Sequence, residues 1–268
     1  MASVKKQLSE NKLSDRLAIA LRKPGKLVSI YFTAGYPGLG DTVPIIRELQ
    51  AAGADMVEIG LPFSDPLADG PTIQESSTAA LKNGMTTSRL FEQLRGIRSQ
   101  IDIPLILMGY FNPILQYGVE AFCRKCREVG IDGLILPDLP LEIYERDYQH
   151  HFKAQGLSMI FLISPQTSET RIRRIDAASD SFIYMVSSAS TTGVQEGFGQ
   201  GQQAYFDRIA AMDLEHPQLV GFGISDAQSF RAATRNAKGA IIGSAFIRLL
   251  TEKGVAGIRG FVEGLRSS

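Results

Sequence analysis

Charge of one sign, cysteine, histidine and long apolar runs are all scarce in this sequence. Lys and Arg together number 28, as do Asp and Glu, so the formal net charge is zero and points neither to nucleic acid nor to an anionic membrane surface. No apolar run approaches the roughly 18 residues of a membrane span, and the N-terminus lacks the apolar core of a secretory signal. We therefore expect a cytoplasmic protein without a nucleic-acid or membrane partner.

The only two cysteines, Cys123 and Cys126, are three residues apart in a segment with helical spacing, residues 120–129. A C-x-x-C redox pair normally opens a helix just after a strand, and a zinc site needs further Cys or His ligands at suitable spacing. The three histidines do not supply that spacing. We expect two reduced thiols and no metal site; a redox or metal half-site is the weaker alternative.

What the sequence does contain is an alternation of short aliphatic runs and amphipathic stretches, repeated about eight times. The runs are apolar throughout, which is typical of parallel strands buried on both faces. They lie at residues 27–33, 55–60, 105–108, 133–136, 158–163, 182–186, 219–221 and 240–242. Such β/α units in about 250 residues predict an α/β fold of the (β/α)₈ TIM-barrel type, with a doubly wound sheet as the alternative.

The helical stretches between these strands carry apolar residues at helical spacing. They lie at residues 41–52, 73–83, 119–129, 142–155, 169–178, 202–212 and 227–234. Several begin at or next to a residue type that caps helix N-termini, and these residues are Asp41, Thr72, Ser168 and Asp226.

The placement of glycine favours the barrel over the doubly wound sheet. A Rossmann-type sheet would carry G-x-G-x-x-G after its first strand, whereas residues 33–38 here are Thr-Ala-Gly-Tyr-Pro-Gly. No linker or low-complexity segment divides the chain. We expect one TIM-barrel domain over residues 1–268, with an extra N-terminal helix at residues 4–22 that caps the bottom of the barrel.

Acidic residues lie in and directly after the second predicted strand. Glu58 is surrounded by apolar residues, where an unpaired charge is costly to bury, and none of the predicted strands contains a Lys or Arg to pair with it. Asp65 and Asp69 follow in a Pro/Gly-rich loop, where either could also serve only to form a turn. Because barrel enzymes work at the C-terminal ends of their strands, we predict acid/base chemistry here.

Two glycine-containing segments, residues 220–225 and 236–245, follow the last two strands. Phosphate sites in barrels are built from these loops and the N-terminus of a short extra helix, where glycine lets backbone N–H groups approach the anion. The sequence therefore predicts a phosphorylated ligand held by Gly221, Gly223, Gly243 and Ser244.

Two further features follow from the region of the sixth predicted strand. Tyr184 lies inside an apolar run, where the pattern alone indicates an ordinary core aromatic. The segment at residues 187–203 is small, polar and Gly-rich, which predicts a mobile lid; the alternative is a surface loop without a role.

Residues 58–74, Glu-Ile-Gly-Leu-Pro-Phe-Ser-Asp-Pro-Leu-Ala-Asp-Gly-Pro-Thr-Ile-Gln, resemble the signature of the tryptophan synthase alpha subunit family. The resemblance covers the whole chain and continues through residues 110–113, 133–140, 184–193, 221–225 and 243–244. It implies a lyase that cleaves indole-3-glycerol phosphate to indole and glyceraldehyde 3-phosphate, in a retro-aldol reaction without a cofactor.

The resemblance assigns roles to individual residues. Glu58 and Asp69 match the two catalytic carboxylates: Glu58 would transfer protons at indole C3 and at the adjacent hydroxyl, and Asp69 would stabilise the charge on the ring nitrogen. We expect burial to raise the pKa of Glu58 while the polar loop keeps Asp69 ionised. The substrate pocket would include Tyr31, Met108, Ile135, Tyr184, Thr192 and Phe222, and Gly193 would join the phosphate site.

The resemblance also implies a partner, the beta subunit, in an α2β2 tetramer. The loop at residues 62–71, with Asp65, and the segment at 110–113, with Asn112, would face it. Pyridoxal phosphate would belong to the beta subunit, and none is expected in this chain. Binding of the beta subunit could order the loop and raise activity.

Ser188 and Ser190 depart from the family's usual pattern, in which many relatives have Arg and Gly. This departure puts the closing contacts of the lid in doubt and keeps one alternative open, a catalytically weakened chain that acts mainly as an allosteric scaffold for the beta subunit. A different phosphate-binding barrel, such as an aldolase, is disfavoured because neither a strand Lys nor a His cluster is visible.

Overall fold

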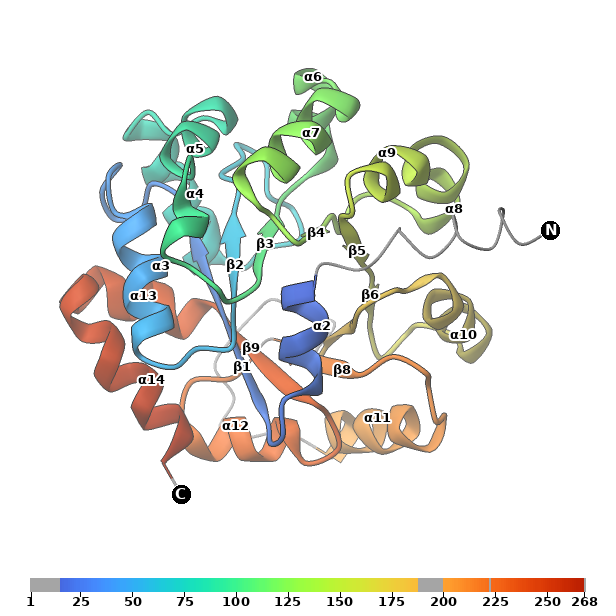
Figure 1. Cartoon of the computed structure of the whole chain (residues 1–268). Helices are drawn as coiled ribbons and strands as arrows, with labels where there is room; N and C mark the ends of the chain where they lie inside the picture. The colour runs from blue at the N-terminus through green and yellow to red at the C-terminus, as the bar shows by residue number, and fades with distance from the viewer. Residues whose placement is uncertain (1–14, 188–199, 222, 268) are drawn as a thin grey trace.

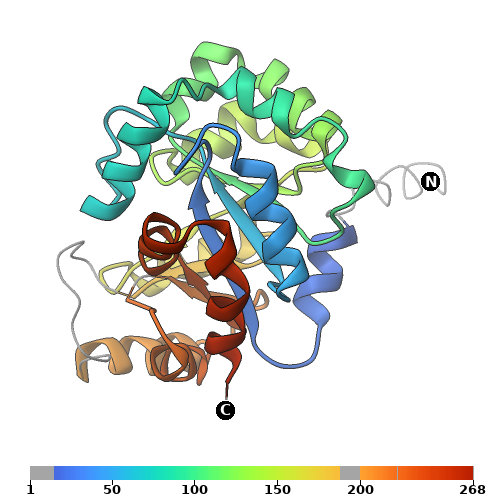
Figure 2. The same cartoon turned by 90° about the vertical axis from the view of Figure 1, so that its left-hand side faces the viewer.

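The computed structural model describes residues 15–187, 200–221 and 223–267. Its strands are all parallel and occur in the order β5-β4-β3-β2-β1-β9-β8-β7-β6, with helices outside them (Figures 1 and 2). They are β1 (Leu27–Thr33), β2 (Met56–Gly60), β3 (Leu105–Met108), β4 (Gly133–Ile135), β5 (Ser158–Ile160), β6 (Leu162–Ile163), β7 (Ile183–Val186), β8 (Gln218–Gly221) and β9 (Gly239–Ile242). The predicted TIM barrel is confirmed, and each predicted strand is present within two residues of its expected bounds.

The predicted strand at residues 158–163 is observed as two segments, β5 and β6, separated at Phe161. β5 pairs with β4, and β6 pairs with β7 through Leu162 and Tyr184. The carbonyl of Phe161 accepts a hydrogen bond of 2.9 Å from the N–H of Tyr184. This one stretch therefore joins the two edges of the sheet and closes the barrel.

The helices alternate with the strands and, apart from the first, α2, cover the outside of the barrel (Figure 1). They are α2 (Asp15–Arg22), α3 (Thr42–Ala51), α4 (Pro71–Lys82), α5 (Thr87–Gln93), α6 (Phe111–Tyr117), α7 (Val119–Val129), α8 (Leu141–Ile143), α9 (Gln149–Ala154), α10 (Glu169–Ala178), α11 (Gln200–Ala211), α12 (Ala227–Thr234), α13 (Ser244–Lys253) and α14 (Ile258–Arg266). None of the helices in the described ranges is long and apolar enough to cross a membrane.

Two of the four predicted helix caps are confirmed. The side chain of Ser168 accepts from the third backbone N–H of α10, and Asp226 forms a capping box at the start of α12. The cap at Thr72 is wrong, because α4 begins at Pro71, whose fixed φ suits the first helical position. Asp41 lies at the N-cap position of α3, but its carboxylate accepts the N–H of Gly38 instead.

Buried apolar side chains form an outer layer between strands and helices and an inner layer inside the barrel. Leu17 and Ala20 of α2 belong to the inner layer, so α2 closes the bottom of the barrel as predicted. The expected helix at residues 4–22 is seen from Asp15 onward, and its earlier residues lie outside the described ranges.

Aspartates that precede strands anchor the bottom of the barrel. Asp132, fully buried before β4, accepts hydrogen bonds from Arg16, from Arg98 and from the N–H of Leu105. Asp55, before β2, likewise accepts a hydrogen bond from the N–H of Val28 and forms ion pairs with the side chains of Lys23 and Arg266. Each carboxylate thus ties the start of the preceding strand to basic side chains.

The cysteines lie on α7, as predicted, and both are buried and free. Burial raises the pKa of Cys123 to about 12 and that of Cys126 well above its usual value, so both remain thiols at neutral pH. Within the described residues, no group of three His, Cys, Asp or Glu side chains could hold a metal ion.

Candidate active site

Glu58 lies inside the barrel and is fully buried. Its Oε1 accepts a hydrogen bond of 2.8 Å from the hydroxyl of Ser29, and its Oε2 has no hydrogen-bond partner among the described residues. Burial raises the pKa of Glu58 to about 8, and the bond from Ser29 opposes that rise. At neutral pH most molecules therefore carry a proton on this carboxyl group.

Asp69 lies in the loop between β2 and α4, and its side chain is buried, unlike that of Asp65. Its Oδ2 accepts a hydrogen bond of 3.0 Å from the hydroxyl of Tyr110, which in turn accepts the N–H of Ala68 at 2.8 Å. Burial raises the pKa of Asp69 to about 6, and the bond from Tyr110 opposes the rise. The loop is less polar than expected, yet Asp69 remains mostly ionised at pH 7 and more acidic than Glu58.

Two buried tyrosines lie near enough to both carboxyl groups for the charges of Glu58 and Asp69 to affect them. Burial first, and then the nearby charges of Glu58 and Asp69, raise the pKa of Tyr184 well above its usual value. Burial and the charge of Asp69 likewise raise the pKa of Tyr31, with a smaller effect from Glu58. The structure thus brings these four predicted residues together at the same end of the barrel.

Glycines make room for both tyrosine hydroxyls. A Cβ at Gly60 would lie 2.2 Å from the hydroxyl of Tyr31, and a Cβ at Gly221 would lie 2.2 Å from the hydroxyl of Tyr184. No side chain fits at such distances. Gly221, predicted only for a phosphate site, therefore also leaves room for the ring of Tyr184 on the neighbouring strand.

The residues expected around the indole ring also share the inner layer. Tyr31, Ile135 and Tyr184 are buried members of it, and Met108 packs against them. Met108 and Ile135 are paired neighbours on β3 and β4. Phe222 lies outside the described residues, so its predicted place is not tested.

The expected phosphate end is built from β9 and the helix that follows it. α13 begins at Ser244 directly after Gly243, and a Cβ at Gly243 would be 3.5 Å from the Tyr31 ring. Gly223 has a φ of 75°, in the left-handed region that favours glycine. The extra helix near this end is thus present. Thr192 and Gly193 lie outside the described residues.

Only the ends of the predicted lid at residues 187–203 are described. Ser187 is buried, and its N–H donates to the carbonyl of Gly221 at 3.1 Å. Residues 200–203 belong to α11, which begins at Gln200 rather than at residue 202. That part of the expectation is wrong because the first helical turn is polar and carries no apolar periodicity. Ser188 and Ser190 lie outside the described residues.

Parts of the loop after β2 and of the start of α6 are exposed. Asp65 and Asn112 are both exposed, and Leu67 is 89% exposed. Phe63 stacks against Tyr110, with ring centroids 5.2 Å apart. Tyr110 therefore contacts the loop at three points, through Phe63, Ala68 and Asp69.

Sequence reasoning missed Ser29 and the bonding role of Tyr110. A signal for Ser29 was present, because a serine two residues before Tyr31 in an apolar strand faces the same side of the sheet. Tyr110 offered no such signal, because its contact with Asp69 joins residues 41 positions apart.

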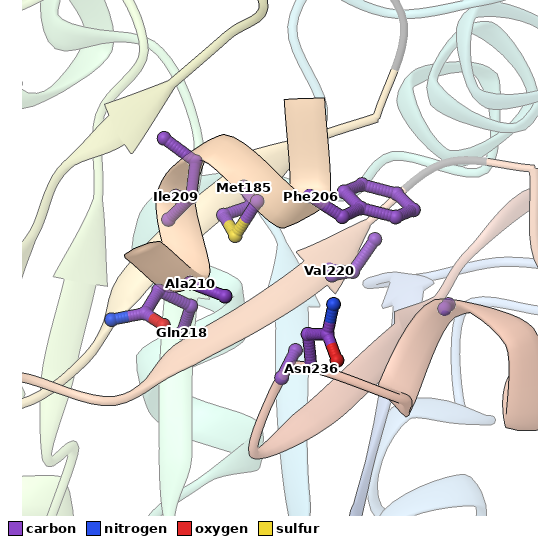
Figure 3. A pocket seen from close by; sticks show the side chains of 9 residues that line it. Met185, Phe206, Ile209, Ala210, Gln218, Val220 and Asn236 are labelled. Carbon is purple, nitrogen blue, oxygen red and sulfur yellow. The ribbon is translucent and has the colours of Figure 1, made fainter. Parts of the chain in front are cut away.

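A small cavity lies elsewhere, between β7, β8 and the helices α11 and α12 (Figure 3). Its lining is mostly apolar and consists of Met185, Phe206, Ile209, Ala210, Gln218, Val220, Ala233, Asn236 and Ala237. Met185 and Val220 belong to the outer layer, whereas Tyr184 belongs to the inner one. The cavity is therefore on the other side of the barrel wall from the carboxyl groups.

Comparison with known proteins decides the family. A family model described as "Tryptophan synthase alpha chain" matches residues 18–261. The chain belongs to the tryptophan synthase alpha chain family. It is 60% identical over 253 residues to the tryptophan synthase alpha chain of Christiangramia forsetii, covering 94% of this chain and 99% of that relative. It is 62% identical over 248 residues to that of Flavobacterium psychrophilum, covering 92% and 98%.

Solved structures agree with the tryptophan synthase alpha chain assignment. The alpha chain from Legionella pneumophila matches with a TM-score of 0.84 at 32% identity, over 94% of this chain and 95% of that one. A Mycobacterium tuberculosis tryptophan synthase in an aminoacrylate-bound form matches with a TM-score of 0.82 at 29% identity, over 93% and 97%. The chain is accordingly a lyase of tryptophan biosynthesis, from a family that cleaves indole-3-glycerol phosphate and works with a beta subunit.

Proposed function

We propose that Glu58 and Asp69 carry out the cleavage of indole-3-glycerol phosphate to indole and glyceraldehyde 3-phosphate. The observation that supports this most strongly is Glu58 itself: it is fully buried in the barrel, it has no cationic partner among the described residues, and one of its oxygens makes no bond to them. An ionisable group in such a position is costly to keep, which favours a catalytic role.

Glu58 starts the reaction as the acid. With a pKa of about 8 it holds a proton at neutral pH and delivers it to C3 of the indole ring. The ring nitrogen becomes cationic. Glu58, now a carboxylate, takes the proton of the adjacent hydroxyl; the C–O bond becomes a carbonyl, and the electrons of the breaking C–C bond restore the aromatic ring.

Asp69 supplies the complementary charge. Its pKa of about 6 leaves it mostly ionised at neutral pH, so it stabilises the cationic ring nitrogen. The hydroxyl of Tyr110 holds Oδ2 of Asp69, which fixes the direction of this carboxylate before substrate arrives. Two carboxyl groups with separated pKa values divide the acid and charge-stabilising duties.

The substrate is held at both ends. The start of the ten-residue helix α13 offers unpaired backbone N–H groups to the phosphate. The residues proposed to bind the phosphate are Gly193, Gly221, Gly223, Gly243 and Ser244. The indole ring occupies the apolar space among Tyr31, Met108, Ile135, Thr192, Tyr184 and Phe222. Fixing both ends places the bond to be broken beside Glu58.

The chain is proposed to act as one barrel domain over residues 1–268, in the cytoplasm, within an α2β2 tetramer whose beta subunit carries pyridoxal phosphate. The loop with Asp65 and the start of α6 with Asn112 are proposed to face that subunit. Their exposure, and that of Leu67, supports this placement.

The test is indole release from indole-3-glycerol phosphate by the purified chain, with and without added beta subunit. Glu58→Gln should abolish release and Asp69→Asn should reduce it at least tenfold, in line with the usual size of acid/base effects. Glu263→Gln, the same change as Glu58→Gln at an exposed position of α14, is the control and should leave release unchanged. Near-normal release by Glu58→Gln would refute the assignment. A folded wild-type chain that releases no indole yet activates the beta subunit would instead support the scaffold alternative.

A further inference from the structure

Ser29 is the one described residue that hydrogen-bonds to the carboxyl group of Glu58. Both side chains are fully buried. β1 and β2 pair in parallel, with Tyr31 opposite Glu58 and Ser29 opposite Met56. Because alternate residues of a strand face the same side, Ser29 lies on the inner face two residues below Tyr31, toward the bottom of the barrel. Its hydroxyl thus reaches Glu58 from the side away from the mouth.

This geometry distinguishes the two carboxyl oxygens of Glu58. Ser29 donates to Oε1, at 2.8 Å, so a proton bound by Glu58 sits on Oε2, which has no partner among the described residues. Burying a hydroxyl group costs free energy unless it makes a hydrogen bond, and alanine at this fully buried strand position would avoid that cost. The bond to Glu58 therefore explains the presence of a serine here.

We propose that Ser29 is a positioning residue for the lyase reaction: its hydrogen bond to Oε1 fixes the carboxyl group of Glu58 so that Oε2 is the oxygen that gives and takes the proton. This inference rests on the catalytic role proposed for Glu58. Ser29 itself does not touch the substrate, so its effect is on proton transfer and not on binding.

The bond from Ser29 also stabilises the ionised form of Glu58 and so opposes the effect of burial on its pKa. Loss of the hydroxyl therefore has a consequence that a packing defect would not have. The pKa of Glu58 rises further, and the ionisation in the pH–rate profile that belongs to Glu58 moves to higher pH.

The experiment compares Ser29→Ala, Ser29→Thr and Ser29→Val in the full chain. Thr and Val have nearly the same shape, and both suit a strand, so Ser29→Thr and Ser29→Val differ mainly by the hydroxyl group. This pair remains informative even if Ser29→Ala perturbs the packing of the core. The control is Ser158→Ala, the same change at a buried serine of β5 that does not bond to Glu58. Thermal unfolding of every variant verifies that it is folded.

We expect kcat for indole release to fall about tenfold or more in Ser29→Ala and Ser29→Val, with KM within about twofold of wild type. Ser29→Thr should keep kcat within about threefold of wild type, on the same hydrogen-bond argument. Titration of the Glu58 carboxyl by ¹³C NMR should show an upward pKa shift in Ser29→Ala and Ser29→Val, and none in Ser29→Thr or in Ser158→Ala.

Equal kcat in Ser29→Thr and Ser29→Val would overturn the proposal, as would an unshifted Glu58 titration in Ser29→Val. Its failure is separable from that of the proposed function. If Glu58→Gln is inactive while Ser29→Val is normal, only the role of Ser29 is refuted; if Glu58→Gln is active, the catalytic assignment itself is lost.

Discussion

The hydroxyl of Tyr184 occupies the space that a side chain at Gly221 would need, since a Cβ there would lie 2.2 Å from it. β7 and β8 are adjacent, so this contact crosses directly between neighbouring strands. Gly221, the last residue of β8, consequently fixes the position of an aromatic ring beside the carboxyl groups.

Gly221→Ala should displace Tyr184 and lower kcat/KM at least tenfold, because overpacking of a fully packed interior costs about 1–3 kcal/mol and moves the side chains that meet there. The melting temperature should also fall. Gly264→Ala is the matched control: it lies in α14 with open space around its Cβ, so it should stabilise the chain by about 0.5–1 kcal/mol and leave kcat/KM unchanged. Equal kinetics in both variants would contradict the role of the contact.

Glu58→Gln should raise the free energy of unfolding, and the increase should be larger at higher pH. The pKa of Glu58 is 4.5 in a model peptide and about 8 in the folded chain, so the folded state binds the extra proton between these values. Stability therefore falls as pH rises through this window, and an uncharged Gln avoids the loss. The gain should be under about 1 kcal/mol at pH 5 and roughly 3 kcal/mol at pH 7. Urea unfolding at both pH values measures it, and a gain independent of pH would disprove the burial argument.

The rate of indole release should follow a bell-shaped pH profile. It needs Asp69 ionised, with a pKa of about 6, and Glu58 protonated, with a pKa of about 8. Tyr110→Phe removes the bond that lowers the pKa of Asp69, so the acid limb should move to higher pH and the alkaline limb should stay. Tyr117→Phe, in the same region on α6, should leave both limbs in place. A shift of the alkaline limb alone in Tyr110→Phe would contradict the assignment.

Asp132→Ala should destabilise the chain by about 3–5 kcal/mol, because it leaves the partly buried guanidinium groups of Arg16 and Arg98 and the N–H of Leu105 without their acceptor. Asp132 lies at the bottom of the barrel, so kcat per folded molecule should remain within about twofold of wild type, the range expected when no substrate contact is lost. Chemical unfolding and indole release on the same samples test both statements. A large loss of kcat in molecules that remain folded would contradict this division between bottom and mouth.

The architecture could be predicted from the sequence because parallel strands of a barrel are apolar on both faces and stand out in length and composition. All eight predicted runs are strands, and α2 closes the bottom where an extra helix was expected. The break at Phe161 could not be predicted, because it arises when one strand pairs with two different neighbours.

Helix details were harder to predict than strands. The expected helix at residues 142–155 consists of α8, a π-helical turn at Tyr144–Tyr148 and α9. The short helices α5 and α6 were not predicted at all, and neither was α14 near the end of the chain. α5 and α6 have seven residues each, which give too few periodic positions for the spacing to show.

For the two carboxyl groups of the candidate site, the residues could be singled out from the sequence but their hydrogen bonds could not. The local sequence pointed to Glu58 and Asp69, whereas Ser29 and Tyr110 became visible only when strand register and loop course were known. Asp132 is as deeply buried as Glu58, and two arginines far from it in sequence neutralise it. Burial alone therefore does not separate structural from functional carboxylates; their partners do.

The two aspartates at the bottom of the barrel limit which substitutions this chain can accept during evolution. Asp55 and Asp132 each bind several distant residues at once, so a substitution at either aspartate leaves several groups without their partner. The carboxyl groups of Glu58 and Asp69 each have one side-chain partner among the described residues. Single substitutions at the mouth can thus alter the chemistry of the site while the hydrogen bonds at the bottom of the barrel stay the same.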